Sequence, residues 1–95
     1  MAELTFTWDG GKDLANARKH GITFAEAATA FADDSGLLRD DPDHSDDEDR
    51  FILLGLSAVP RLLIVVHACR QGGDSVRLIS ARKATRREES AYWKR

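Results

Sequence analysis

The chain has 95 residues and a formal net charge of −2, and 42% of its residues are hydrophobic. This length predicts a single domain over residues 1–95, and the composition excludes a disordered chain. No apolar run approaches the ~18 residues of a membrane span, and the first residues lack the layout of a signal peptide. Because the single cysteine, Cys69, cannot form an internal disulfide, we expect a cytoplasmic protein.

The N-terminal part of the sequence predicts an edge strand followed by a helix. Apolar and polar residues alternate over Leu4–Trp8, which is typical of a strand. Asp9 is suited to cap a helix with its body over Lys12–His20. Gly21 is suited to end this helix in a left-handed conformation.

A second helix is predicted directly after this glycine. Thr23 and Glu26 have the spacing of a capping box, and the apolar residues that follow fall on one face of a helix ending near Ala32. Two short helices joined in this way present an apolar side that a sheet must cover.

Strands dominate the middle of the chain. Gly36–Asp40 is predicted as a strand that an acidic segment interrupts, and Arg50–Ser57 is followed after a short turn by Arg61–Cys69. The glycines of Gln71–Asp74 indicate a hairpin turn into a last strand, Ser75–Ala81. The strand that precedes this turn is apolar on both faces, so we expect it to be central.

A last helix is predicted at the C-terminal end. Thr85 and Glu88 repeat the spacing of a capping box, and the helix runs through Tyr92 and Trp93. The expected fold class is α+β, an antiparallel sheet with an N-terminal two-helix hairpin and a C-terminal helix, in the order β-α-α-β-β-β-α.

The predicted hairpin turn fixes which side chains share a face of the sheet. It places Arg70 opposite Ser75, so that alternation puts Arg70 and Arg77 on one face. The same face is expected to carry Ile64, Val66, Ala68, Ile79 and Ala81.

A second register brings a third arginine to this face. If Leu56 pairs with Leu62, then Arg50 lies beside the other two arginines at one end of three adjacent strands. Ile52 and Leu54 are then expected on the same face. His67 falls on the opposite face, where it is either a core histidine or a catalytic group.

Three converging guanidinium groups repel one another unless an anion lies between them. Arginine's planar fork suits phosphate, so a phosphodiester is the natural ligand. Charge is distributed accordingly: seven acidic residues lie within 40–49, and the rest of the chain, with nine acidic and 14 basic residues, carries +5. The alternative interpretation is that the acidic segment supplies the counter-charges of these arginines.

Other kinds of site are excluded or disfavoured. The acidic segment lacks the central glycine and final glutamate of an EF-hand loop. The three histidines lack the spacing of a zinc site, and no nucleotide-binding or hydrolase motif is present. We therefore predict neither a metal nor a cofactor.

Several motifs together resemble the BrnT family of type II toxins, which are paired with BrnA antitoxins. The resemblance rests on Trp8–Asp9, Asn16, the sequence KHGITF at Lys19–Phe24, Ala27, Phe31, Arg50–Gly55 and Arg77–Tyr92. It covers nearly the whole chain. It implies a RelE-like fold and a small metal-independent ribonuclease that halts translation until its antitoxin covers it. The implied partners are RNA and a BrnA-like antitoxin, in either a homodimer or a toxin–antitoxin heterotetramer.

RNA cleavage without a metal requires a base, an acid and cations that stabilise the charge developing on phosphorus. The predicted catalytic residues are Arg50, His67, Arg70, Arg77 and Arg82, with His67 or Glu48 as the base. The predicted substrate-binding residues are Lys19, His20, Arg86 and Tyr92. The alternative function is a non-catalytic nucleic-acid-binding module, although nothing in the sequence indicates a helix-turn-helix.

Overall fold

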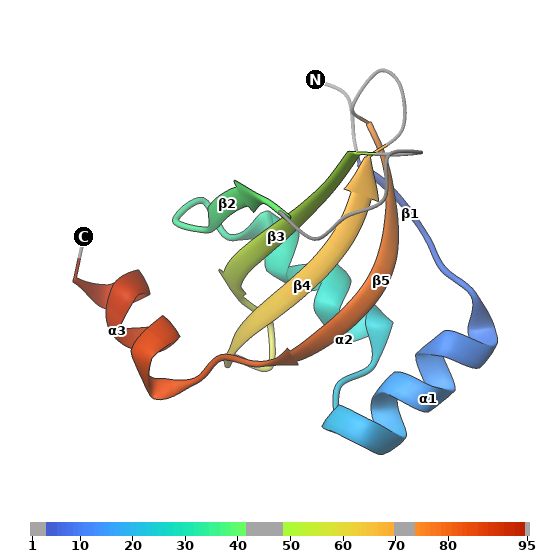
Figure 1. The fold of residues 1–95 in the computed structure, drawn as a ribbon, viewed down its shortest axis with the longest axis horizontal. Helices are drawn as coiled ribbons and strands as arrows, with labels where there is room; N and C mark the ends of the chain where they lie inside the picture. Colours follow the sequence, from blue (N-terminus) through green and yellow to red (C-terminus); the bar gives the residue numbers. More distant parts are fainter. Residues whose placement is uncertain (1–3, 42–48, 70–73, 95) are drawn as a thin grey trace.

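The computed structural model describes residues 4–41, 49–69 and 74–94, and a five-stranded sheet organises them (Figure 1). Residues 70–73, with the predicted Arg70 and most of the predicted turn, lie outside this description. Within the described residues, no helix has the length and apolar character that crossing a membrane requires.

In chain order the elements are β1 (Thr5–Thr7), α1 (Gly10–His20), α2 (Phe24–Thr29), the 3-10 helix η1 (Ala30–Ala32), β2 (Leu37–Asp40), β3 (Asp49–Leu56), β4 (Leu62–Cys69), β5 (Ser75–Lys83) and α3 (Arg86–Trp93).

The sheet is mixed, so the predicted all-antiparallel sheet is wrong in one pairing. The strand order is β1-β5-β4-β3-β2, and β1 runs parallel to β5 while the other neighbours are antiparallel. No hairpin joins β1 to β5, so no local turn could indicate their relative direction. The predicted element order also counts one strand too few, because Leu37–Asp40 forms an edge strand of its own. The β4 strand is central, as predicted.

The predicted limits of the first helix are confirmed. The Asp9 carboxylate accepts a hydrogen bond from the backbone N–H of Lys12 at 3.0 Å. Gly21 has a φ of 73° and donates its N–H to the carbonyl of Ala17. A residue other than glycine would be strained in this left-handed conformation, and the chain turns here into α2.

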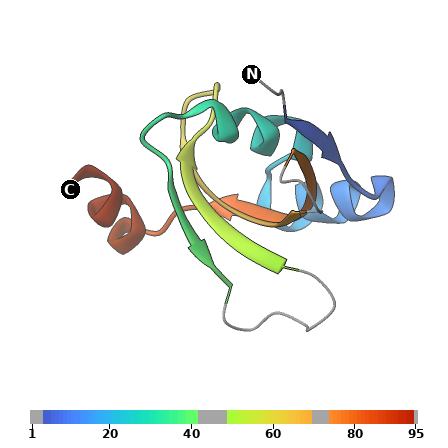
Figure 2. The same cartoon turned by 90° about the horizontal axis from the view of Figure 1, so that it is seen from above.

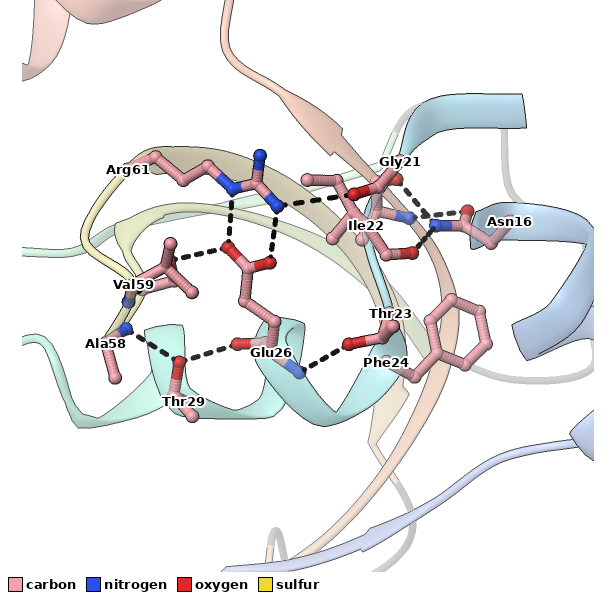
Figure 3. A network of polar contacts seen from close by, with 12 residues as sticks. Asn16, Gly21, Ile22, Thr23, Phe24, Glu26, Thr29, Ala58, Val59 and Arg61 are labelled. Atoms are coloured by element: carbon pink, nitrogen blue, oxygen red, sulfur yellow. Dashed lines mark hydrogen bonds and ion pairs between the residues drawn. The ribbon is translucent and has the colours of Figure 1, made fainter. Parts of the chain in front are cut away.

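The predicted capping box of the second helix forms only by half, because Glu26 has other partners. Thr23 accepts the N–H of Glu26 at 3.1 Å. The Glu26 carboxylate instead accepts bonds from Nε and Nη2 of Arg61, at 2.8 and 2.7 Å, and from the hydroxyl of Ser57 at 2.8 Å. The bonds from Arg61 hold the pKa of Glu26 below its ordinary value. This network fixes α2 to the turn between β3 and β4 (Figure 3).

The two faces of the sheet are covered to different extents. Phe24 and Ala27 of α2 pack with Val65 and Leu78 in the main core, and Figure 2 shows α2 lying over this side. On the other side, Tyr92 of α3 packs in a smaller cluster over one end of the sheet. Its buried partners there are Leu54, Leu62 and Ile64. We call this second side, which carries Ile52, Ile64, Val66 and Ala68, the open face.

The predicted strand registers are confirmed up to a bulge in β5. Leu56 pairs with Leu62, and on the other side of β4 the pairing is the expected one as far as His67 with Leu78. The next pair is Val66 with Ser80, so that Ile79 is an extra residue. The bulge moves every later residue of β5 to the face opposite to the predicted one.

Ala81 shows the consequence of this shift. It pairs with Val65 and is fully buried in the main core, whereas the prediction placed it beside Arg77 on the open face. A bulge can form without glycine, and the residues around Ile79 include none, so no local signal marks its position.

Asn16 attaches α1 to the edge of β5. Its side-chain nitrogen donates to the carbonyls of Ala81 and Ile22, at 2.8 and 2.9 Å, and its oxygen accepts the N–H of Ala81 at 3.0 Å. The β1 strand ends opposite Arg77, so it does not extend to this part of β5. The Asn16 amide therefore takes the place of a neighbouring strand at this position.

We expect Asn16→Leu to lower the free energy of unfolding by about 2–4 kcal/mol, because it leaves buried backbone groups without partners. Urea denaturation measures this loss. Leu14→Ala is the matched control, since Leu14 lies on the same helix and is 63% exposed. The control should change stability by less than about 0.5 kcal/mol. Equal stability of the Asn16 variant and the wild type would show that the amide is dispensable.

Candidate functional site

Arg50 and Arg77 flank Ala68 on the open face. Ala68 of the central strand pairs with Arg50 on one side and with Arg77 on the other. The Cα atoms of the two arginines are therefore separated by two strand spacings, about 10 Å. Both arginines are half-buried, and Ala68 is buried between them. Two guanidinium groups at this separation can reach one phosphate from both sides.

The open face also carries an arginine that the sequence analysis missed. Arg39 of β2 pairs with Ile52, so alternation along these strands places it on the same face as Arg50. It is exposed. Its signal in the sequence is the strand pattern of Gly36–Asp40, for which no short turn predicts a register. The open face thus presents basic residues from β2, β3 and β5.

Arg82 has a structural partner. Its Nη1 and Nη2 atoms donate to the two carboxylate oxygens of Glu88 at 2.8 and 2.9 Å, and the same carboxylate accepts the N–H of Thr85 at 2.8 Å. The bonds from Arg82 are the main reason that the pKa of Glu88 falls from 4.5 to about 2. The predicted capping box at Thr85 is complete. This ion pair joins the end of β5 to α3, so we do not retain Arg82 as a catalytic residue.

His67 is a core residue, which corrects its prediction as a base. It is 1% exposed and lies on the face covered by α2 and η1. Its ring packs edge-on against the ring of Phe31, with 4.7 Å between the ring centroids. Its Nδ1 lies 3.1 Å from the carbonyl oxygen of Val65. Burial lowers the pKa of His67, so the neutral ring is favoured. The whole sheet separates it from Arg50 and Arg77.

Tyr92 is an anchor for α3 and not a surface for substrate. It is 5% exposed, and its hydroxyl donates to the carboxylate of Asp33 at 2.7 Å. Arg86, also predicted to bind substrate, lies exposed in the first turn of the same helix. Glu48, the alternative base, lies outside the described residues.

Lys19 and His20 occupy the last turn of α1. They line an open groove of about 230 Å³ between α1 and β5, together with Lys12, which the sequence analysis did not single out. The structure therefore places Arg50 and Arg77 on the open face and Lys19 and His20 at this groove. No group of three His, Cys, Asp or Glu side chains within residues 4–41, 49–69 and 74–94 is arranged to hold a metal ion.

An apolar groove of about 230 Å³ lies between α3 and the open face. It is lined by Leu37, Leu38, Arg39, Ile52, Leu54, Ile64, Glu88 and Ala91. Arg39 lines this groove and is also one of the basic residues of the open face, so the groove adjoins the basic part of that face. A ligand on this face can meet apolar and cationic groups side by side.

Comparison with known proteins identifies a matching family and a related fold. A family model described as ribonuclease toxin, BrnT, of type II toxin-antitoxin system matches residues 8–88. No curated protein matches the chain. A crystal structure of the Brucella abortus ribonuclease toxin BrnT aligns with a TM-score of 0.60 and 22% identity, covering 90% of this chain and 100% of that one. At this identity, the structural match shows a shared fold.

The Arg82–Glu88 pair predicts a pH dependence of stability. Because folding lowers the pKa of Glu88 from 4.5 to about 2, the pair stabilises the protein above pH 4.5 and loses this contribution as the pH falls towards 2. Solvent screening limits the contribution to about 1 kcal/mol, as for other surface pairs. Glu88→Gln, which can still cap the helix, should therefore be less stable than the wild type at pH 7, and the difference should vanish near pH 2.

Thermal unfolding followed between pH 2 and 7 measures this difference. Glu89→Gln is the control, because Glu89 is exposed in the same turn of α3. It should retain the wild-type profile. A constant difference between Glu88→Gln and the wild type across this range would contradict the account of the pair.

Proposed function

Since this chain belongs to the BrnT family of ribonuclease toxins of type II toxin–antitoxin systems, we propose that it is a metal-independent endoribonuclease that inhibits translation. Its activity is held in check by a BrnA-like antitoxin. The observation that carries the proposal is the placement of Arg50 and Arg77 on either side of Ala68 on the open face. The proposed site of action is the cytoplasm, where its RNA substrate is found.

The proposed reaction is attack by an RNA 2′-hydroxyl on the adjacent phosphorus. The bond from the 2′-oxygen to phosphorus forms, and the bond to the 5′-oxygen breaks. A proton leaves the 2′-hydroxyl and a proton is added to the leaving 5′-oxygen, so that the products are a 2′,3′-cyclic phosphate and a 5′-hydroxyl. Charge accumulates on the phosphoryl oxygens in between, and the guanidinium groups of Arg50 and Arg77 are placed to stabilise it.

The burial of His67 in the core removes it as a candidate base for this reaction. Because His67 lies in the core, Glu48 remains the proposed base, and we assign most of the rate to stabilisation of the phosphorane by arginine. The same observation favours one alternative, a non-catalytic module that binds nucleic acid through the same face. Cleavage assays distinguish the two functions.

Neutralisation follows from the same geometry. An antitoxin that covers the open face excludes RNA from Arg50 and Arg77. The apolar groove beside α3 offers it contact area that RNA phosphate does not use. We propose this arrangement for the toxin–antitoxin complex, either as a heterotetramer or with the toxin first forming a homodimer, and we assign the fold to the RelE-like group.

We predict that the purified protein cleaves RNA in the presence of EDTA and that Arg77→Ala reduces kcat/KM by ~100-fold or more. This reduction corresponds to the ~2.7–4 kcal/mol lost when one preorganised donor to a developing oxyanion is removed. Arg87→Ala is the matched control, because Arg87 is exposed on α3. It should retain activity within about threefold, as expected for a surface charge. RNA in which every 2′-hydroxyl is replaced by hydrogen should not be cleaved.

The thermal midpoint of each variant establishes that it is folded. If folded wild-type protein binds RNA but cleaves it neither in EDTA nor with added Mg²⁺, the non-catalytic module is favoured, whereas cleavage only with Mg²⁺ would contradict metal independence. Unchanged cleavage by folded Arg77→Ala would show that the reaction takes place elsewhere on the molecule.

A further inference from the structure

A second basic surface lies beside β5, in the open groove that α1 forms with the bulged part of this strand. The groove has a volume of about 230 Å³. Its lining consists of Lys12, Ala15, Asn16, Lys19 and His20 of α1, and Ile79 and Ser80 of β5. No acidic side chain is among these residues.

The helix presents these side chains to the groove as a consequence of its attachment to β5. Residues 12, 16 and 19 recur at the spacing that places side chains on one face of a helix. Asn16, in the middle of this face, is bonded to both backbone groups of Ala81. Its three hydrogen bonds fix the rotation of α1, so Lys12 and Lys19 are held on the side of the helix that faces β5.

The two carboxylates nearest to Lys12 in sequence, those of Asp9 and Asp13, bind backbone N–H groups and form no ion pair with the lysines. The Asp9 carboxylate accepts the backbone N–H of Lys12 as the helix cap, and the Asp13 carboxylate accepts the N–H of Phe24 at 2.8 Å. Within the part of the chain that the structure describes, neither Lys12 nor Lys19 makes an ion pair. The groove is therefore a concave surface whose lining carries two lysines without ion pairs among the described residues.

The groove continues the basic surface of the open face. Ser80 pairs with Val66, which alternation along β4 places on the same face as Ala68 and Arg77. Arg77 and Ser80 are three residues apart, at most about 10 Å along the strand. A single strand of nucleic acid bound between Arg50 and Arg77 can reach the groove without crossing an element of the fold.

We propose that this groove is a second phosphate subsite, which binds the phosphodiester of a nucleotide that flanks the one held by Arg50 and Arg77. Lys12 and Lys19 supply charge, and Ser80 and His20 supply groups that can donate hydrogen bonds. The inference rests on the proposed function in taking RNA as the ligand. It extends that function by giving the RNA strand a path over the fold, from β3 across β4 and β5 to α1.

The test measures binding of a fluorescent 2′-deoxyoctanucleotide, which cannot undergo attack by a 2′-hydroxyl, by anisotropy at several salt concentrations. Lys19→Gln should weaken binding roughly five- to tenfold at low salt and reduce the slope of log affinity against log salt by about one. Arg18→Gln is the matched control, since it removes the same charge from the neighbouring, exposed residue outside the groove. It should change affinity by less than about twofold.

Each outcome decides the proposal. Equal losses for Lys19→Gln and Arg18→Gln would overturn it, because they would show diffuse attraction without a subsite. Unchanged oligonucleotide affinity for Lys19→Gln, together with weaker binding of the antitoxin, would also overturn it and would assign the groove to the protein partner. A selective loss of oligonucleotide affinity supports it even if the wild type fails to cleave RNA, so that catalysis and this subsite are tested separately.

Discussion

The hydrogen bonds between the side-chain amide of Asn16 and the backbone of Ala81 determine how α1 sits on the sheet. A strand edge with buried, unsatisfied backbone groups is costly, and β1 is too short to satisfy this part of β5. The amide supplies one donor and one acceptor to the same residue, at 2.8 and 3.0 Å. The orientation of α1, and with it the positions of Lys12 and Lys19, follows from this contact.

A second polar network holds α2 on one side of the sheet. Glu26 of α2 binds Arg61 through two hydrogen bonds, and Arg61 also donates to the carbonyl of Gly21 at the turn between α1 and α2 (Figure 3). Thr29 accepts the N–H of Ala58 at 2.9 Å, which adds another link from α2 to the β3–β4 turn. This network thereby fixes α2 over the main core, and the opposite face retains room for a ligand beyond the end that α3 covers.

The sequence predicted those features that depend on local signals. The caps at Asp9, Gly21 and Thr85 follow from side-chain chemistry within a few residues, and the register of Leu56 with Leu62 follows from a short turn. Together with the register of the β4–β5 hairpin, it predicts that Arg50 and Arg77 share one face of the sheet.

Features that depend on tertiary packing were not predictable in this way. The bulge at Ile79 leaves no trace in composition, and it moved Ala81 to the core. Glu26 has the position of a capping residue, but Arg61, distant in sequence, provides a charged partner that the backbone N–H of Thr23 cannot match. His67 and Tyr92 have the chemistry of catalytic or substrate-binding residues, and only their burial shows that they stabilise the fold.

The central claim is that nucleic acid binds to the open face between Arg50 and Arg77. Mapping of backbone amide chemical shifts by NMR, during titration with a 2′-deoxyoctanucleotide, tests it most directly. The account predicts that the largest changes occur at Arg50, Ala68 and Arg77. Changes confined to α2 and η1, on the opposite face of the sheet, would contradict it.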